Sequence, residues 1–176
     1  MKKLLKGIGF ALAFLVVTAG GLTVYHFATT STFQLIAVYM NDGTPPVFRW
    51  SAEQALYVFH PDEQDVEQLN REAGAQYVVG VLDPEEARPV LKHLMDNGLD
   101  INSFSEVDGS RFTALHAAAL SNNPRGVRLL LEFGADPTLK DGQGRTPLEL
   151  VRFADNRENS LEDFSDVMKV LEKAQS

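Results

Sequence analysis

The feature that most constrains the fold is a pair of signatures that each occur twice. A Thr-x-Leu box stands at Thr113–Leu115 and returns at Thr146–Leu148, 33 residues later. A Gly-x-Asp signature stands at residues 98–100 and returns at residues 134–136, 36 residues later. We attribute the three additional residues to an insertion near residues 105–107. A period of this length indicates one supersecondary unit that is repeated and stacked, because a single unit cannot bury its apolar face alone.

Within one period the capping residues predict two short helices. Thr113 is a favoured N-cap for a first helix, and Asn123 followed by Pro124 is a favoured start for a second. Gly134 predicts that the second helix ends in the left-handed conformation. In the next period, Thr146 with Glu149 matches a capping box. The repeated unit is therefore predicted to be a helical hairpin.

These residues resemble one complete ankyrin repeat. The residues that carry the resemblance are the box Thr113-Ala114-Leu115-His116, the small pair Ala118-Ala119, the apolar residues Val127, Leu129, Leu130 and Leu131, and the loop Gly134-Ala135-Asp136. The resemblance implies an all-α fold, namely a short ankyrin-repeat solenoid of stacked helical hairpins with N- and C-terminal caps. It also implies that the His116 ring holds its turn through hydrogen bonds to neighbouring backbone.

The expected organisation follows from the resemblance. The predicted segments are a signal anchor or transmembrane helix (1–28), a linker and extended lead-in (29–50), an N-terminal capping hairpin (51–75), a degenerate ankyrin repeat (76–107), an ankyrin repeat (108–140) and a C-terminal capping repeat (141–176). The first repeat is degenerate because Tyr77, Val79 and Gly80 occupy its box. In the last repeat Val151-Arg152 replaces the small pair. Because a buried arginine without a partner is costly, we expect no further hairpin to stack beyond this repeat.

The N-terminal sequence predicts export. Residues from Gly7 to Tyr25 form a run of 19 without a charge, preceded by Lys2, Lys3 and Lys6. About 20 apolar residues span a bilayer, and flanking lysines stay on the cytoplasmic side. We therefore predict a single-pass inner-membrane helix with the C-terminal domain in a bacterial periplasm. The alternative is a signal peptide cleaved after residues 17–19, which leaves a soluble periplasmic protein.

The lead-in has no clear periodicity. Phe33–Met40 is apolar and predicts a strand, and residues 41–46 have the composition of a turn. Val47–Trp50 is either a second strand or an extended lead-in. Ser51 and Gln54 match a capping box, so the first helix is expected to begin at Ser51.

Charge and composition restrict the partners. The chain has a formal net charge of −8, and beyond the first six residues it has 13 basic and 24 acidic residues, hence −11. Such a surface repels nucleic acid and attracts a basic protein. The alternative is that the acidic residues only keep the domain soluble. The absence of cysteine excludes disulfides and thiolate metal sites.

The sequence offers no convincing catalytic or metal-binding constellation. The histidines at positions 26, 60, 93 and 116 lack metal-ligand spacing with acidic residues. A nucleophile elbow and a glycine-rich phosphate loop are likewise missing from the sequence. We therefore expect no enzyme activity, no cofactor, no metal and no small-molecule substrate.

The resemblance implies protein binding through the turn fingers and the first helices. Carried over by position, the predicted binding residues are Ser110, Arg111, Phe112, Leu120, Ser121, Asn122, Gln143 and Arg145. Phe112 is selected as an exposed aromatic without an obvious folding role, and the alternative is that it packs on the insertion near residues 105–107. The favoured function is an immunity protein that sequesters a secreted, envelope-targeting toxin such as a phospholipase effector. The alternative is an envelope adaptor or regulatory protein, for example in oxidative-stress defence.

Overall fold

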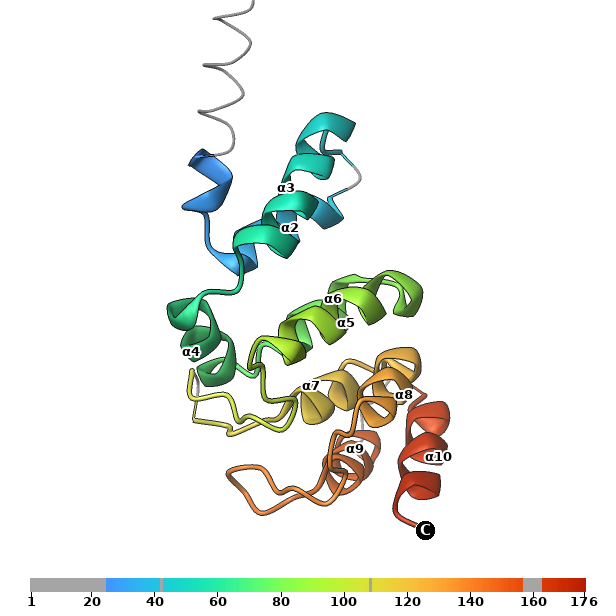
Figure 1. The fold of residues 1–176 in the computed structure, drawn as a ribbon. Coiled ribbons are helices and arrows are strands. Elements are labelled where there is room, and N and C mark those ends of the chain that lie inside the picture. The colour runs from blue at the N-terminus through green and yellow to red at the C-terminus, as the bar shows by residue number, and fades with distance from the viewer. Residues whose placement is uncertain (1–24, 42, 108, 157–162) are drawn as a thin grey trace, which may run out of the picture. The chain divides into compact units, whose positions relative to one another are not determined.

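The computed structural model describes residues 25–41, 43–107, 109–156 and 163–176 (Figure 1). Throughout these residues every regular element is a helix, which confirms the predicted all-α class. The chain divides into two compact units, Met1–His60 (unit 1) and Pro61–Ser176 (unit 2). Residues 1–24 of the predicted membrane segment lie outside the described residues. None of the helices in the described ranges is long and apolar enough to cross a membrane.

Unit 1 contains a helical hairpin. Helix α2 (Thr32–Met40) packs against helix α3 (Pro46–Phe59). Their shared core consists of Phe27, Leu35, Ala52 and Ala55, with Val38 and Tyr39 packed against it. Because two alanines on α3 face this core, the backbones of the two helices can approach closely.

The predicted strand over Phe33–Met40 is wrong, because these residues form α2. A short apolar run fits a buried helix as well as a buried strand, and periodicity alone does not separate the two. The residues that α2 buries are Thr32, Leu35 and Ile36, which follow the i, i+3, i+4 spacing of one helical face.

The predicted start of the next helix at Ser51 is also wrong, since α3 already begins at Pro46. A proline is tolerated in the first helical turn, where no partner exists for its missing N–H. The Ser51 hydroxyl donates to the Val47 carbonyl at 2.8 Å instead of capping a helix. Residues 29–50 are therefore largely helical rather than an extended lead-in, and the capping hairpin predicted for residues 51–75 falls across the boundary between the two units.

Unit 2 consists of stacked helical hairpins. Its helices are α4 (Glu63–Arg71), α5 (Ala75–Val81), α6 (Pro84–Asp96), α7 (Ala114–Leu120), α8 (Pro124–Glu132), α9 (Pro147–Asp155) and α10 (Ser165–Ala174). The first helices α5, α7 and α9 are neighbours in one layer, and the second helices α6, α8 and α10 are neighbours in the other (Figure 1). This is the two-layer arrangement that the repeat predicts.

The predicted caps of unit 2 are confirmed. The Thr113 side chain caps α7, and the Asn123 carboxamide accepts the Gly126 N–H at 2.8 Å at the start of α8. At α9 the capping box is complete, because Thr146 donates its N–H to the Glu149 carboxylate at 2.8 Å and accepts the Glu149 N–H at 3.3 Å. These bonds satisfy backbone donors that a helix leaves free at its N-terminus.

The Gly-x-Asp signature joins successive repeats through an asparagine. Gly98 has a φ of 110°, which places it in the left-handed region and ends α6. The Asn70 side chain donates to the Gly98 carbonyl at 3.1 Å and accepts the Asp100 N–H at 2.7 Å. One side chain from α4 thus satisfies a donor and an acceptor of the following loop.

The same bridge recurs one repeat later. Gly134 has a φ of 90°. Asn102 donates to the Gly134 carbonyl at 3.3 Å and accepts the Asp136 N–H at 2.8 Å. The two asparagines are 32 residues apart, so this contact is part of the repeat and holds adjacent loops in register.

The last hairpin exposes the arginine that replaces the small pair. Val151 is fully buried, whereas Arg152 is exposed and pairs with Glu172 of α10 at 2.7 Å. Arg152 thus lies at the surface, where an ionic partner and water solvate its charge.

Candidate functional site

The candidate site is built on two turn fingers, residues 103–113 and residues 137–146. The fingers are joined directly, because Gly142 donates its N–H to the Ser110 carbonyl at 2.7 Å. A Cβ at Gly142 would lie 3.0 Å from the carbonyl oxygens of both Gly109 and Ser110. A side chain at this position would therefore push the two fingers apart by a few tenths of an ångström.

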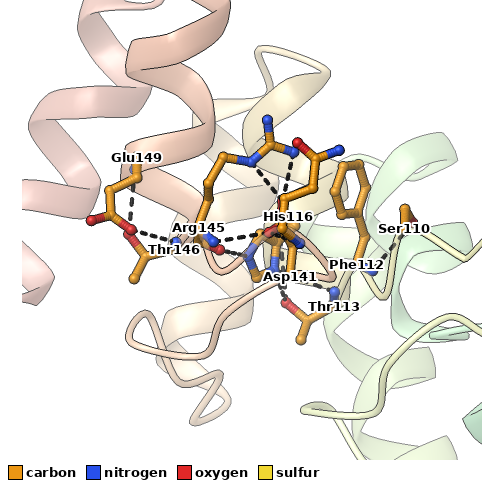
Figure 2. A network of polar contacts seen from close by, with 9 residues as sticks. Ser110, Phe112, Thr113, His116, Asp141, Arg145, Thr146 and Glu149 are labelled. Carbon is orange, nitrogen blue, oxygen red and sulfur yellow. Dashed lines mark hydrogen bonds and ion pairs between the residues drawn. The ribbon is translucent and has the colours of Figure 1, made fainter.

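A buried carboxylate organises the second finger. The Asp141 side chain is 1% exposed and accepts four hydrogen bonds (Figure 2). One oxygen accepts the N–H groups of Gln143 at 2.8 Å and Arg145 at 2.9 Å. The other accepts Nε and Nη2 of Arg145 at 2.9 and 2.7 Å. Burial alone raises the pKa of Asp141, but the hydrogen bonds from Arg145 and Gln143 outweigh it and lower the pKa.

His116 links the first helix to both fingers. Its ring is fully buried, and Nδ1 lies 2.9 Å from the Thr113 hydroxyl. Nε2 lies 3.0 Å from the Arg145 carbonyl, so this nitrogen carries the proton. Burial lowers the pKa of His116, which keeps the ring neutral. The predicted role of His116 in holding its own turn is confirmed, and the contact with Arg145 extends that role to the next repeat.

Two predicted binding residues have structural partners. Phe112 is half-buried and stacks on the His116 ring, with centroids 5.7 Å apart and an interplanar angle of 8°. The premise that Phe112 is exposed without a folding role is therefore wrong. Arg145 has a side chain that is 20% exposed and fully engaged with Asp141, and its guanidinium lies 5.4 Å from the centroid of the Phe153 ring.

The remaining finger residues are more accessible. Arg111 is exposed, has a φ of 52°, and places its guanidinium 4.9 Å from the centroid of the Phe104 ring. Together with Glu106 these two residues help to line an open cleft of about 630 Å³. Ser110 is half-buried and Gln143 is exposed. The fingers thus offer a rigid, mixed polar surface.

Leu120, Ser121 and Asn122 lie at the opposite end of α7, about 10 Å along the helix from the first finger. The structure therefore separates the predicted residues into a finger group and a helix-end group. The Asn122 side chain donates to the Asp163 carbonyl at 3.1 Å, which fixes its position.

An open cleft of about 480 Å³ adjoins the helix-end group. Ser121 and Asn122 line it together with Gln76, Val79 and Gly80 of α5. These α5 residues were not predicted, because the degenerate box of the first repeat hides their equivalence to α7. The sequence signal that could have identified the exposed side of α5 is the helical spacing of Ala75, Val78 and Val79, which are its buried positions.

The exposed apolar side chains of unit 2 gather on the first helices. Tyr77 and Val81 on α5, Leu120 on α7 and Phe153 on α9 are between 38% and 66% exposed. Among the described residues of unit 2, the other large apolar side chain exposed to this degree is Val107 in the first finger. We call Tyr77, Val81, Leu120 and Phe153 the first-helix face. A row of this kind is what a protein partner buries at the centre of an interface.

The described residues contain no group of three or more histidine or acidic side chains that could hold a metal ion. The polar network of the fingers is instead internally satisfied, with each donor directed at a neighbouring acceptor (Figure 2). The arrangement therefore presents a preorganised surface.

Comparison with known proteins gives the same result as the geometry. The family model described as "Ankyrin repeats (many copies)" matches residues 94–151. The chain is 36% identical over 83 residues to the E3 ubiquitin-protein ligase hecd-1 of Caenorhabditis elegans, covering 47% of this chain and 3% of that protein. It is 28% identical over 120 residues to the putative E3 ubiquitin-protein ligase XBAT35 of Arabidopsis thaliana, covering 68% and 24%.

A third relative is the human ankyrin repeat and SOCS box protein 9, which is 35% identical over 66 residues, covering 38% of this chain and 21% of that protein. The chain thus spans less than a quarter of each of these three relatives. The caps, the bridged Gly-x-Asp loops, the two helix layers and these matches agree with one another. Residues 94–151 of the chain therefore form ankyrin repeats.

Proposed function

We propose that unit 2 is a non-catalytic protein-binding module that holds its partner with the first-helix face and the exposed finger residues. The observation that carries the proposal is the gathering of exposed apolar side chains on α5, α7 and α9. Aromatic and aliphatic anchors of this kind dominate binding energy when a partner desolvates them. Because the finger network is already ordered, little conformational entropy remains to be lost on binding.

The partner is a protein with a basic surface. Unit 2 has 12 basic and 22 acidic residues, hence a net charge of −10. A field of this sign accelerates encounter with a basic protein and disfavours acidic competitors. Apolar anchors and acidic surroundings together favour a basic protein over nucleic acid, whose phosphates the same field repels.

We place this module in the bacterial periplasm, held to the inner membrane by residues 7–25. The support is the uncharged run behind Lys2, Lys3 and Lys6. The three relatives described above come from animals and a plant, so the placement depends on the N-terminal sequence. If the leader is cleaved instead, the same module is a soluble periplasmic protein.

Within this setting, the role we propose is immunity, in which the module sequesters a secreted toxin that attacks the envelope, such as a phospholipase effector. An exported acidic binding surface is suited to intercept a basic toxin before it reaches its substrate. An adaptor for an envelope enzyme would use the same surface, so the partner that is captured decides between the two roles.

The test is protection of a deletion strain. The wild-type gene is expected to restore survival against an effector encoded beside it, and Leu120→Asp or Phe153→Asp is expected to abolish protection without lowering the protein level. Arg128→Asp on the opposite layer is the matched control, because Arg128 is exposed on α8 and is expected to remain protective. Survival of the deletion strain against every neighbouring effector would refute the immunity role. A silent periplasm-only reporter fused to Ser176 would refute the placement.

A further inference from the structure

Unit 1 is depleted of charge to a degree that unit 2 is not. Within unit 1, the range from residue 27 to residue 60 contains Asp42, Arg49 and Glu53 as its only charged side chains, whereas unit 2 has 34. The single cation is engaged within the hairpin, because Arg49 donates its Nε to the Tyr39 carbonyl at 2.9 Å. The hairpin therefore presents little charge to its surroundings.

Helix α3 exposes apolar side chains on the side opposite its buried face. Ala52, Ala55 and Leu56 are buried on the side that faces α2. Val47, Trp50 and Val58 lie on the opposite side at i, i+3 and i+11, and they are 63%, 61% and 66% exposed. We call these three residues the outer α3 face. Gln54, at i+7, is exposed on the same side and is uncharged. An exposed apolar patch of this kind marks a contact surface for protein or membrane.

A short stretch of chain connects this hairpin to the predicted membrane segment. The uncharged run ends at Tyr25, and Phe27, two residues later, already packs in the hairpin core with Leu35. Two residues of chain reach at most about 7 Å. If residues 7–25 span the bilayer, the hairpin is held at its surface, where tryptophan and tyrosine are enriched.

We propose that the outer α3 face inserts into the boundary between lipid headgroups and acyl chains. This inference rests on the membrane anchoring in the proposed function. The chemistry that favours lipid is the combination of one tryptophan, two valines and no charge on the inserted face. Because insertion is apolar, it is expected to be independent of anionic lipid and of salt.

The chain itself supplies the probe, because Trp50 is its only tryptophan. The full chain is reconstituted into phosphatidylcholine vesicles, with and without phosphatidylcholine brominated on its acyl chains, and flotation verifies that the chain is membrane-bound. The expected result is that bromolipid quenches the Trp50 emission and that aqueous iodide does not.

Three results would overturn the proposal, and they are distinguishable. A floating chain whose Trp50 is quenched by iodide and not by bromolipid has the outer α3 face in water. Protection from both quenchers shows that protein covers the face, as in a pair of chains. If the chain does not float with the vesicles, both the proposed membrane anchoring and this inference are refuted. The first two results refute this inference alone.

A pair of matched variants tests the same point with the same two quenchers of Trp50. Val58→Asp is expected to reduce bromolipid quenching and to admit iodide, since a carboxylate resists transfer into the acyl region. Val107→Asp in unit 2 is the control, because Val107 is 71% exposed and is expected to change neither signal. Equal responses of both variants would contradict the assignment, and the helix content by circular dichroism confirms that each variant is folded.

Discussion

Replacing His116 tests how the repeats are joined. The ring is fully buried, and it bridges the Thr113 hydroxyl at 2.9 Å and the Arg145 carbonyl at 3.0 Å. Each of these hydrogen bonds is worth about 1 kcal/mol, and a cavity of ring size adds to their loss, so His116→Ala is expected to destabilise unit 2 by ~3 kcal/mol. His116→Gln retains a donor for the Arg145 carbonyl and is expected to lose about 1 kcal/mol.

The lowered pKa of His116 determines in which direction the unfolding free energy changes with pH. Burial lowers the pKa of His116 below its usual 6.5, so the folded ring stays neutral while the unfolded ring binds a proton. The stability that the neutral His116 ring contributes is present above the pKa of this ring in the unfolded chain, and it is lost as the pH falls below that value. The wild type is therefore expected to lose stability from about pH 7 to about pH 5, with a slope of at most ~1.4 kcal/mol per pH unit.

The assay is urea unfolding of residues 61–176, followed by far-ultraviolet circular dichroism at several pH values. His116→Gln does not titrate, so the difference in unfolding free energy between wild type and this variant is expected to narrow as the pH falls below 6.5. A difference in unfolding free energy that does not change with pH would show that folding does not protect the His116 ring from protonation. A widening difference would show that the fold prefers the protonated ring, which would refute the assignment of the proton to Nε2 alone.

Three further substitutions are expected to separate buried from exposed polar contacts in the same unfolding assay. Asp141→Asn should cost about 1–3 kcal/mol at neutral pH. The pKa of Asp141 is lowered in the folded state, so the stability that this carboxylate contributes is present above the unfolded pKa of 3.8 and is lost as the pH falls through the folded pKa. The loss of stability in Asp141→Asn should therefore become smaller in acid. A loss that does not change with pH would contradict an ionised carboxylate. Asn102→Ala removes the bridge to Gly134 and should cost about 1–2 kcal/mol, and a negligible cost would mean that the bridge does not couple the repeats. Arg152→Ala breaks a half-exposed ion pair with Glu172 and should change the unfolding free energy by less than about 1 kcal/mol, so a larger loss would contradict its exposure.

The sequence predicted the elements whose signals are local. Thr113 and Thr146 cap helices as expected because a cap is decided by residues within four positions of it. Gly134 adopts the left-handed conformation for the same reason. By contrast, the apolar run Phe33–Met40 fits either a strand or a helix, and packing against α3 determines which one forms.

The candidate site was less predictable because exposure depends on tertiary contacts. Arg145 was selected as a binding residue, but the structure commits it to Asp141, and the type of a residue does not reveal whether its charge is already paired. Phe112 was selected for exposure, but the buried ring of His116 gives it a partner. Val81 was overlooked because the degenerate box does not show which positions of its helix correspond to the exposed positions of the complete repeat.

The most direct test of the central claim is site-specific photocrosslinking in living cells that carry the natural partner. A photoreactive residue at position 120, on the first-helix face, is expected to form one discrete adduct with another protein. The same residue at position 128, exposed on α8, is expected to form none. Adducts from position 128 with none from position 120 would show that the partner binds the opposite layer and would contradict the assignment of the binding surface.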